Sequence, residues 1–410
     1  MAKIQKGKSP FYPGQPVPGE LFVGRASQIE RIMTRGVGQT AAGKPMAIFI
    51  QGEYGIGKSS IAGFVQWMAE REHGLLGLYA PLGGAATLDD VAAAVLEATV
   101  RAGAYAPGLS EKIRGFLGKY IGEQSLFGIK VHAEALKDDA PALASPARLL
   151  PFFKETIDRT RDAGIKGIFL VLDEINGITS NAQFAHFIKG LVDANALSKE
   201  PVPLLLMLCG VEDRRHEMIR SHQPIDRIFD VIQIDSMDQR EMEEFFSKAF
   251  ESVQMKIDAA AMKLLTHYSA GFPKIMHLLG DAAYWIDKDG TVDHDDAAAA
   301  ILIGAEDVGR KYVDQQVFNA LRSADYRSIL AKIATMGPMS MSFIKNDVAK
   351  GLTDTEKKKF NNFLQKMKKL NVIRSGDVSG EYIFNIRMVR FYIWLQASKL
   401  KAGKPGIEVA

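Results

Sequence analysis

Gly52-Glu53-Tyr54-Gly55-Ile56-Gly57-Lys58-Ser59 is the stretch that decides the fold. It matches the P-loop pattern G-x-x-x-x-G-K-[S/T] at every fixed position. The apolar segment 46–51 before it predicts a strand, and residues 59–71 after it predict a helix. In that setting glycines let backbone N–H groups surround phosphate oxygens, and the helix start presents its positive end to the same anion. We therefore expect ATP binding, with Lys58 on the β- and γ-phosphates and Ser59 on Mg²⁺.

A second motif follows a buried strand further along the chain. The apolar run Ile168–Leu172 leads directly into Asp173-Glu174. An aspartate at the end of such a strand can hold Mg²⁺, and the adjacent glutamate can orient and deprotonate the attacking water. An acidic pair that merely caps a strand is the alternative. Together the two motifs predict an ATPase (a hydrolase), and a nucleotide-binding scaffold without turnover is a further reading.

The pattern around these motifs predicts an α/β core. The expected strands are 46–51, 77–82, 166–173, 202–210 and 229–234, and the expected helices are 27–35, 59–71, 88–102, 149–163 and 181–197. Strands alternating with helices indicate βαβ units and a parallel sheet, and fully apolar strands indicate that both faces are covered. Residues 103–150 suggest no chemistry.

From residue 238 the pattern changes to helices. We expect them at 238–251, 258–269, 272–287, 293–304 and 308–322, which would form a helical lid. Helices at 326–336, 341–349 and 354–370, strands at 372–375 and 382–385, and a helix at 387–398 then predict a winged helix-turn-helix. The predicted domains are an N-terminal arm (1–20), a P-loop core (21–236), the lid (237–322) and the winged-helix domain with its tail (323–410).

The order of these features resembles AAA+ ATPases. The resembling parts are Phe22-Val23-Gly24-Arg25, the P-loop as Walker A, Asp173-Glu174 as Walker B, an arginine-rich segment, the lid and the winged helix. They are most similar to the branch shared by replication-initiator and STAND ATPases, over most of residues 20–398. The nucleotide contacts implied by the resemblance are Gly52, Glu53, Tyr54, Gly55, Ile56, Gly57, Lys58, Ser59 and Ser60.

The resemblance also implies roles outside the two motifs. Phe22 and Val23 would lie near the adenine, although the segment could equally be an N-terminal strap. Arg227, or else Arg220, would reach the ATP of a neighbouring subunit in a homo-oligomer, the alternative being ordinary surface salt bridges. Lys274 stands where the family keeps a second sensor, usually arginine; a solvated lysine is the alternative. The first sensor is usually Asn, Ser or Thr, but here the strand ends at Cys209-Gly210, and Asp213 is a weak substitute.

Composition indicates the cellular location and the kind of partner to expect. A single cysteine excludes an internal disulfide, no apolar run is long enough for a membrane helix, and the cytoplasm is the expected location. Net charge is +3, yet residues 326–404 hold 16 Lys and Arg against 5 Asp and Glu. The cationic side chains expected at a double-stranded DNA surface are Lys357, Lys358, Lys359, Lys366 and Arg374.

Lysine dominance favours phosphate contacts over base reading. A lysine face that only keeps a protein-contact module soluble is the alternative. Two functions therefore stay open. One is an oligomeric AAA+ ATPase whose nucleotide state controls a DNA-contacting winged helix. The other is a STAND-like regulatory switch that signals to a protein partner without DNA.

Overall fold

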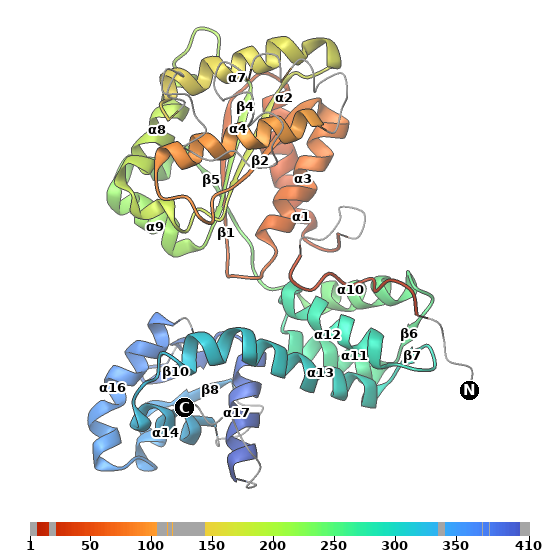
Figure 1. Cartoon of the computed structure of the whole chain (residues 1–410), viewed down its shortest axis with the longest axis vertical. Coiled ribbons are helices and arrows are strands. Elements are labelled where there is room, and N and C mark those ends of the chain that lie inside the picture. Colours follow the sequence, from red (N-terminus) through yellow and green to blue (C-terminus); the bar gives the residue numbers. More distant parts are fainter. Residues whose placement is uncertain are drawn as a thin grey trace. The chain divides into compact units, whose positions relative to one another are not determined.

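The chain forms two compact units in a computed structural model that describes residues 6–15, 22–104, 113, 117, 144–334, 341–370, 372–376 and 378–401. One unit comprises residues 16–235, and the other comprises residues 1–15 together with 236–410 (Figure 1). Most of segment 103–150 and parts of the predicted arm (1–5 and 16–20) lie outside the described residues. Among the helices that the structure describes, none combines the length and the apolar character needed to cross a bilayer.

Five parallel strands form the sheet of the first unit, in the order β2-β3-β4-β1-β5. They are β1 Met46–Gln51, β2 Leu75–Pro81, β3 Gly167–Asp173, β4 Leu204–Gly210 and β5 Asp230–Gln233. Every residue of β3 and β4 is buried, as their continuous apolar sequences predict for strands covered on both faces. Because β4 lies between β1 and β3, the P-loop and the acidic pair leave the same edge of the sheet, one strand apart.

Helices cover both faces of this sheet (Figure 1). In chain order they are α1 Ala26–Arg31, the π-helix η2 Ile32–Val37, α2 Gly38–Ala41, α3 Lys58–His73, α4 Leu88–Ala104, α7 Pro146–Thr160, η4 Arg161–Ala163, η5 Ile178–Ser180, α8 Ala182–Ala196, α9 Glu212–Ser221 and η6 Gln223–Ile228. Helices α4, α7 and α8 bury their apolar sides with Phe49, Leu170 and Leu206 in one core cluster. On the other face, η2 brings Gly36 against the side chains of Ile48 and Leu205.

The second unit begins with a packed set of helices. They are α10 Gln239–Glu251, α11 Ala259–Ser269, α12 Pro273–Ile286, α13 His294–Val308 and the π-helix η7 Gly309–Phe318. Helix α10 starts sharply because Asp238 and Glu241 form a capping box. A parallel ladder of two residues on each side, β6 Lys256–Ile257 with β7 Thr291–Val292, also occurs here, and the sequence did not predict it.

A mixed arrangement of helices and short strands ends the second unit. Its elements are α14 Ala324–Ala334, β8 Ser342–Ile344, α15 Lys345–Lys350, α16 Asp354–Lys369, β9 Ile373–Ser375, β10 Glu381–Phe384 and α17 Arg387–Lys401. The strands form an antiparallel sheet in the order β8-β10-β9. The single helix predicted for 341–349 is wrong at its start, because Phe343 stacks on Tyr382 of β10 at 5.6 Å and the backbone there is extended. The winged-helix assignment itself stays a prediction.

Residues 6–15 of the predicted arm pack on the helices of the second unit. The ring of Phe11, 4% exposed, lies 5.0 Å from that of Phe250 and 5.9 Å from that of Phe245. A side chain at Gly280 would collide with this ring. The N–H of Tyr12 donates to Nδ1 of His277 at 3.2 Å, and burial lowers the pKa of His277 to about 4, so this nitrogen is an acceptor at neutral pH.

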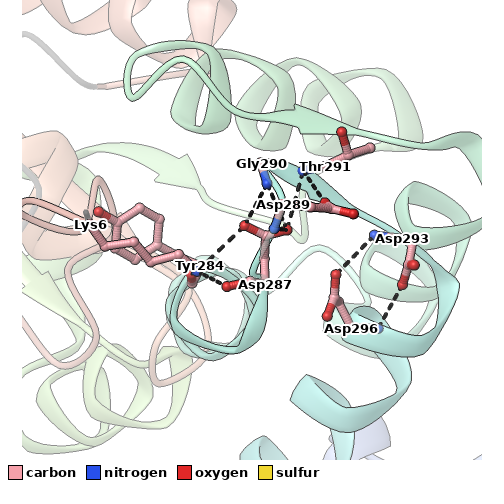
Figure 2. Close-up of polar contacts among 8 residues, drawn as sticks. All are labelled: Lys6, Tyr284, Asp287, Asp289, Gly290, Thr291, Asp293 and Asp296. Carbon is pink, nitrogen blue, oxygen red and sulfur yellow. Dashed lines mark hydrogen bonds and ion pairs between the residues drawn. The ribbon is translucent and has the colours of Figure 1, made fainter. Parts of the chain in front are cut away.

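Lys6 fixes the beginning of the same segment (Figure 2). Its ammonium group donates to the backbone carbonyls of Tyr284 and Asp287 and lies 3.5 Å from the Asp287 carboxylate. That carboxylate is buried and also accepts the N–H groups of Gly290 and Thr291 at 3.1 and 3.2 Å. The described part of the arm is thus held at two points, by the ion pair of Lys6 and by the packing of the Phe11 ring.

Candidate nucleotide site

The P-loop is shaped to hold an anion. Gly57 has φ +100° and immediately precedes α3, a conformation that favours glycine. At Gly52 a Cβ would lie 2.5 Å from the carbonyl oxygen of Ile234, so only glycine fits there. The first turn of α3 has no capping side chain among the described residues. Its N–H groups are therefore left to bind an anion from outside the chain.

Lys58 lies folded over the loop. Its Nζ donates to the carbonyl oxygens of Gly52 and Glu53 at 2.9 and 2.8 Å, and it lies 5.6 Å from the ring centre of Tyr54. Burial lowers the pKa of Lys58, while the nearby carboxylates of Asp173, Glu53 and Glu174 raise it in part. The structure thus brings the P-loop lysine and both predicted acidic residues into electrostatic contact.

The acidic pair has a distinctive backbone. Asp173 is 4% exposed, and its Oδ1 accepts the N–H of Glu174 at 2.8 Å. Glu174 is exposed and has φ +56°, a left-handed conformation that costs a non-glycine residue energy and is often found at functional sites. Its carboxylate lies against Gly83, where any Cβ would collide with it. A side chain at residue 83 would therefore have to displace the end of the Glu174 side chain.

Tyr79 joins this group from β2, and no sequence pattern indicated it. Its phenol donates to Oδ2 of Asp173 and receives a hydrogen bond from Ser59. Burial, the Asp173 charge and the hydrogen bond to it raise the pKa of Tyr79, so the phenol is neutral. Ser59 and Asp173, the two predicted Mg²⁺ ligands, thus converge on one oxygen atom. Hydroxyl and carboxylate oxygens are the donors that Mg²⁺ takes, so the residues fit the ion.

Cys209 occupies the place predicted for the first sensor. It pairs with Ile50 in the sheet, is fully buried, and interacts electrostatically with Asp173 and Lys58. Burial raises the pKa of its thiol, which therefore stays protonated and offers only a weak donor. Asp213, the weak substitute, lies exposed in the first turn of α9.

The segment Phe22–Arg25 packs beside the P-loop. Arg25 is 5% exposed, and its guanidinium donates to the carbonyl oxygen of Ile56 at 3.4 Å. Phe22 stacks on Phe64 of α3 with ring centres 4.8 Å apart, and Val23 is half-buried. Whether an adenine lies against this segment stays a prediction.

The arginines after β4 fall into two groups. Arg215 donates to Oε1 of Gln51 at 2.8 Å and pairs with Asp226, so it braces the strand that leads into the P-loop. Arg220 is exposed in α9 and acts on Glu217 through its charge. Arg227 is exposed at the end of η6 and makes no hydrogen bond or ion pair with the part of the chain that the structure describes. Its charge is therefore available to an outside partner.

The remaining predicted residues lie in the second unit. Lys274 is exposed in the first turn of α12. Lys357, Lys358 and Lys359 are exposed on α16 and Lys366 is half-buried there; Lys359 pairs with Asp325, and Lys357 lies 3.9 Å from Asp354. Arg374 is exposed on β9 and donates to Oδ1 of Asn385 at 3.3 Å.

No protein-family model matches the chain, and no curated protein matches it in sequence. Solved structures do match. A Walker-type ATPase of Pyrococcus abyssi aligns with a TM-score of 0.55 at 17% identity, over 91% of this chain and 96% of its own. The Aeropyrum pernix ORC2 protein, solved as ADPNP and ADP complexes, aligns with a TM-score of 0.57 at 13% identity, over 93% of this chain and 95% of its own.

At these identities the likeness concerns the fold. It extends over more than nine-tenths of each chain. The chain therefore shares its fold with these two proteins, and the parallel-sheet α/β core predicted from the sequence is confirmed.

Proposed function

We propose that this chain binds and hydrolyses ATP, and that its nucleotide state controls both self-assembly and a basic winged-helix module that contacts DNA. The ATP part rests on one observation: Lys58, Ser59 and Asp173 interact at the carboxyl edge of the sheet, with Glu174 next to them. The uncapped start of α3 opens at the same edge. A nucleotide triphosphate is the ligand class that uses an anion-binding backbone, a cation and two carboxylates together.

Each residue has a defined task in this proposal. Lys58 exchanges its bonds to the Gly52 and Glu53 carbonyls for bonds to phosphate oxygens. Ser59 and Asp173 hold Mg²⁺, which neutralises charge on the phosphates when it is bound. Glu174, exposed beside Asp173, accepts a proton from the attacking water. The neutral thiol of Cys209 is a poor substitute for a polar sensor, which favours slow turnover.

The two structural neighbours give this proposal further support. One is described as a Walker-type ATPase, and the other was solved with ADPNP and ADP. Both share the fold of this chain. ATP and Mg²⁺ are accordingly the proposed cofactors, Walker A is assigned to Gly52–Ser60, and Walker B to Asp173 with Glu174.

Lys58→Ala tests the nucleotide site. We expect ATP affinity to fall about tenfold or more, because a hydrogen bond to a charged group contributes about 1.5–3 kcal/mol. Isothermal titration calorimetry with ATP and Mg²⁺ measures the effect. Lys154→Ala is the matched control, since Lys154 pairs with Glu200 on the surface of the same unit. Equal ATP affinity in Lys58→Ala and the parent protein would contradict the site.

A neighbouring subunit and the chain's own lid complete the site in the proposed assembly. Arg227, exposed and unpaired among the described residues, supplies the finger, and Arg220 is the second choice. Lys274, at the exposed start of α12, approaches the γ-phosphate as a second sensor. Phe22 and Val23 border the adenine, which the packing of Arg25 on the P-loop supports.

The DNA part of the proposal rests on the module formed by residues 323–410, attached to the lid at 237–322. In chain order the module has α14, β8, α15, α16 and the strand pair β9-β10, which fits a winged helix with α16 as the groove-facing helix. Lys358 and Lys369 are exposed on α16 and make no ion pair with any described residue. They are 11 residues apart, so they share one face at a separation of about 16 Å. Two uncompensated cations along one face suit a phosphate backbone.

Replacing both Lys358 and Lys369 by alanine tests this contact. Duplex DNA binding should weaken, and the slope of log K against log[salt] should become shallower by about 0.9 for each phosphate that the variant no longer neutralises. Fluorescence anisotropy over a salt series measures the slope. The control is Lys256→Ala with Lys263→Ala, an equal reduction of charge at two exposed lysines of the same unit. A near-zero slope in the parent protein, or equal changes in both double variants, would remove DNA from the proposal.

The second candidate function is a STAND-like switch that passes its nucleotide state to a protein partner. The buried thiol at the sensor position favours it, because slow turnover suits a switch. DNA-stimulated ATP hydrolysis separates the two functions. Stimulation supports the DNA-contacting assembly, and its absence together with a flat salt slope supports the switch.

A further inference from the structure

Tyr79 connects the two residues proposed to hold Mg²⁺. It lies on β2 opposite Val171 of β3, two residues before Pro81, which pairs with Asp173. Alternate residues of a strand point to the same face, so the Tyr79 and Asp173 side chains extend on one side of the sheet. The phenol donates to Oδ2 of Asp173 and accepts from the hydroxyl of Ser59. The result is a continuous hydrogen-bonded chain, Ser59 to Tyr79 to Asp173.

These hydrogen bonds satisfy the buried negative charge of Asp173. Asp173 is 4% exposed, and its carboxylate needs donors on both oxygens. The Glu174 N–H donates to Oδ1 at 2.8 Å, and the Tyr79 phenol donates to Oδ2. Lys58 contributes attraction, but its ammonium hydrogen-bonds to the Gly52 and Glu53 carbonyls. The phenol is therefore the side-chain donor on which the buried carboxylate depends.

The phenol also occupies an oxygen that Asp173 would offer to the ion. It donates to Oδ2 of Asp173, so the lone pair used in that bond is not free for Mg²⁺ until the bond opens. Tyr79 is half-buried, whereas Leu78 and Ala80 on either side are buried, so part of the Tyr79 side chain contacts solvent.

We propose that Tyr79 is a positioning residue that keeps the magnesium position closed until Mg²⁺ and nucleotide enter together. The proposal rests on the nucleotide-binding function proposed above. Asp173 would hold Mg²⁺ through the oxygen that the phenol now occupies, and the Tyr79 hydroxyl would then no longer bond to it. We call the hydrogen bond from the Tyr79 phenol to Asp173 the latch. It satisfies the buried carboxylate in the empty protein, and breaking it uses part of the free energy of Mg²⁺ binding.

Tyr79→Phe tests the latch because it removes one oxygen and keeps the ring. The probe is the β,γ-imido analogue of ATP, titrated by calorimetry in Mg²⁺ and, separately, in EDTA. In the variant the empty site loses a hydrogen bond to a buried charge, whereas the Mg²⁺-bound site loses nothing. We expect the Kd in Mg²⁺ to fall about tenfold and the Kd in EDTA to stay unchanged. The unchanged Kd in EDTA also shows that the P-loop is folded.

Tyr392→Phe is the matched control. Tyr392 is a buried tyrosine of the second unit that donates to Asp314 at 3.1 and 3.2 Å. Its replacement should lower thermal stability and leave the ratio of the two Kd values as in the parent protein. An unchanged or smaller ratio in Tyr79→Phe overturns the latch, since the phenol would then assist the ion or be irrelevant to it. If the parent protein binds the analogue in neither buffer, the proposed nucleotide-binding function fails first.

Discussion

Glu174→Gln is expected to lower the rate of ATP hydrolysis about a hundredfold or more while ATP affinity stays near that of the parent protein. The amide keeps the shape of the side chain but cannot accept a proton from water, and general-base catalysis contributes about 10²–10⁴-fold. The separation of the two effects follows from the site, because Lys58, Ser59 and Asp173 bind the nucleotide and Glu174 lies exposed beside them. Phosphate release measured at saturating ATP gives the rate, and calorimetry gives the affinity.

The backbone at residue 174 calls for a second variant. Glu174 has φ +56°, so part of any change could come from altered strain. Glu174→Asp shortens the carboxylate by one methylene, and because it keeps the proton acceptor it should recover some hydrolysis relative to glutamine. Hydrolysis at the parent rate in Glu174→Gln would reject the general-base role and favour a scaffold that binds ATP without turnover.

Arg227→Ala should reduce hydrolysis in the assembled protein about a thousandfold, the lower end of what an arginine finger contributes in related phosphoryl transfers. The physical reason is that the exposed guanidinium would neutralise charge on the transferring phosphate of the next subunit. ATP affinity of the dilute protein should hardly change, because Arg227 makes no hydrogen bond or ion pair with the described residues of its own P-loop. Arg161→Ala, which removes an exposed arginine paired with Asp158, is the control.

Mixing two inactive variants decides whether the arginine acts between subunits. Lys58→Ala lacks the nucleotide site but keeps Arg227, whereas Arg227→Ala keeps the site. A mixed interface therefore contains one complete set, and hydrolysis should rise above that of either variant alone. No recovery, together with a parent-like rate in Arg227→Ala, would shift the assignment to Arg220 or reject the finger altogether.

Local pattern was enough to predict the framework of the site. The P-loop pattern and the apolar strands before Lys58 and Asp173 carry their own short-range signals, and both strands form where expected. Tyr79 could not be found in this way. Tyr79 contacts Asp173 because β2 lies next to β3, and the order of strands in a sheet cannot be predicted from the sequence of any single strand.

Long-range contacts explain the other surprises. Phe11 reads as part of a loose Pro- and Gly-rich arm, yet it is buried among aromatic residues more than 200 positions away. The strand at 342–344 is too short to show a period, and it forms because β10 is available as a partner. The ladder of β6 with β7 has the same origin. Each of these elements depends on a partner that is remote in sequence.

The attachment of residues 6–15 to the second unit makes the first unit an insertion within the second. The polypeptide passes from one unit to the other twice, once after Gln15 and again between Asp235 and Ser236. These two crossings define how the protein can be divided. A fragment that starts at Ser236 would leave the Phe11 site on α10 and α12 exposed to water, whereas adding residues 6–15 as a separate peptide would refill it.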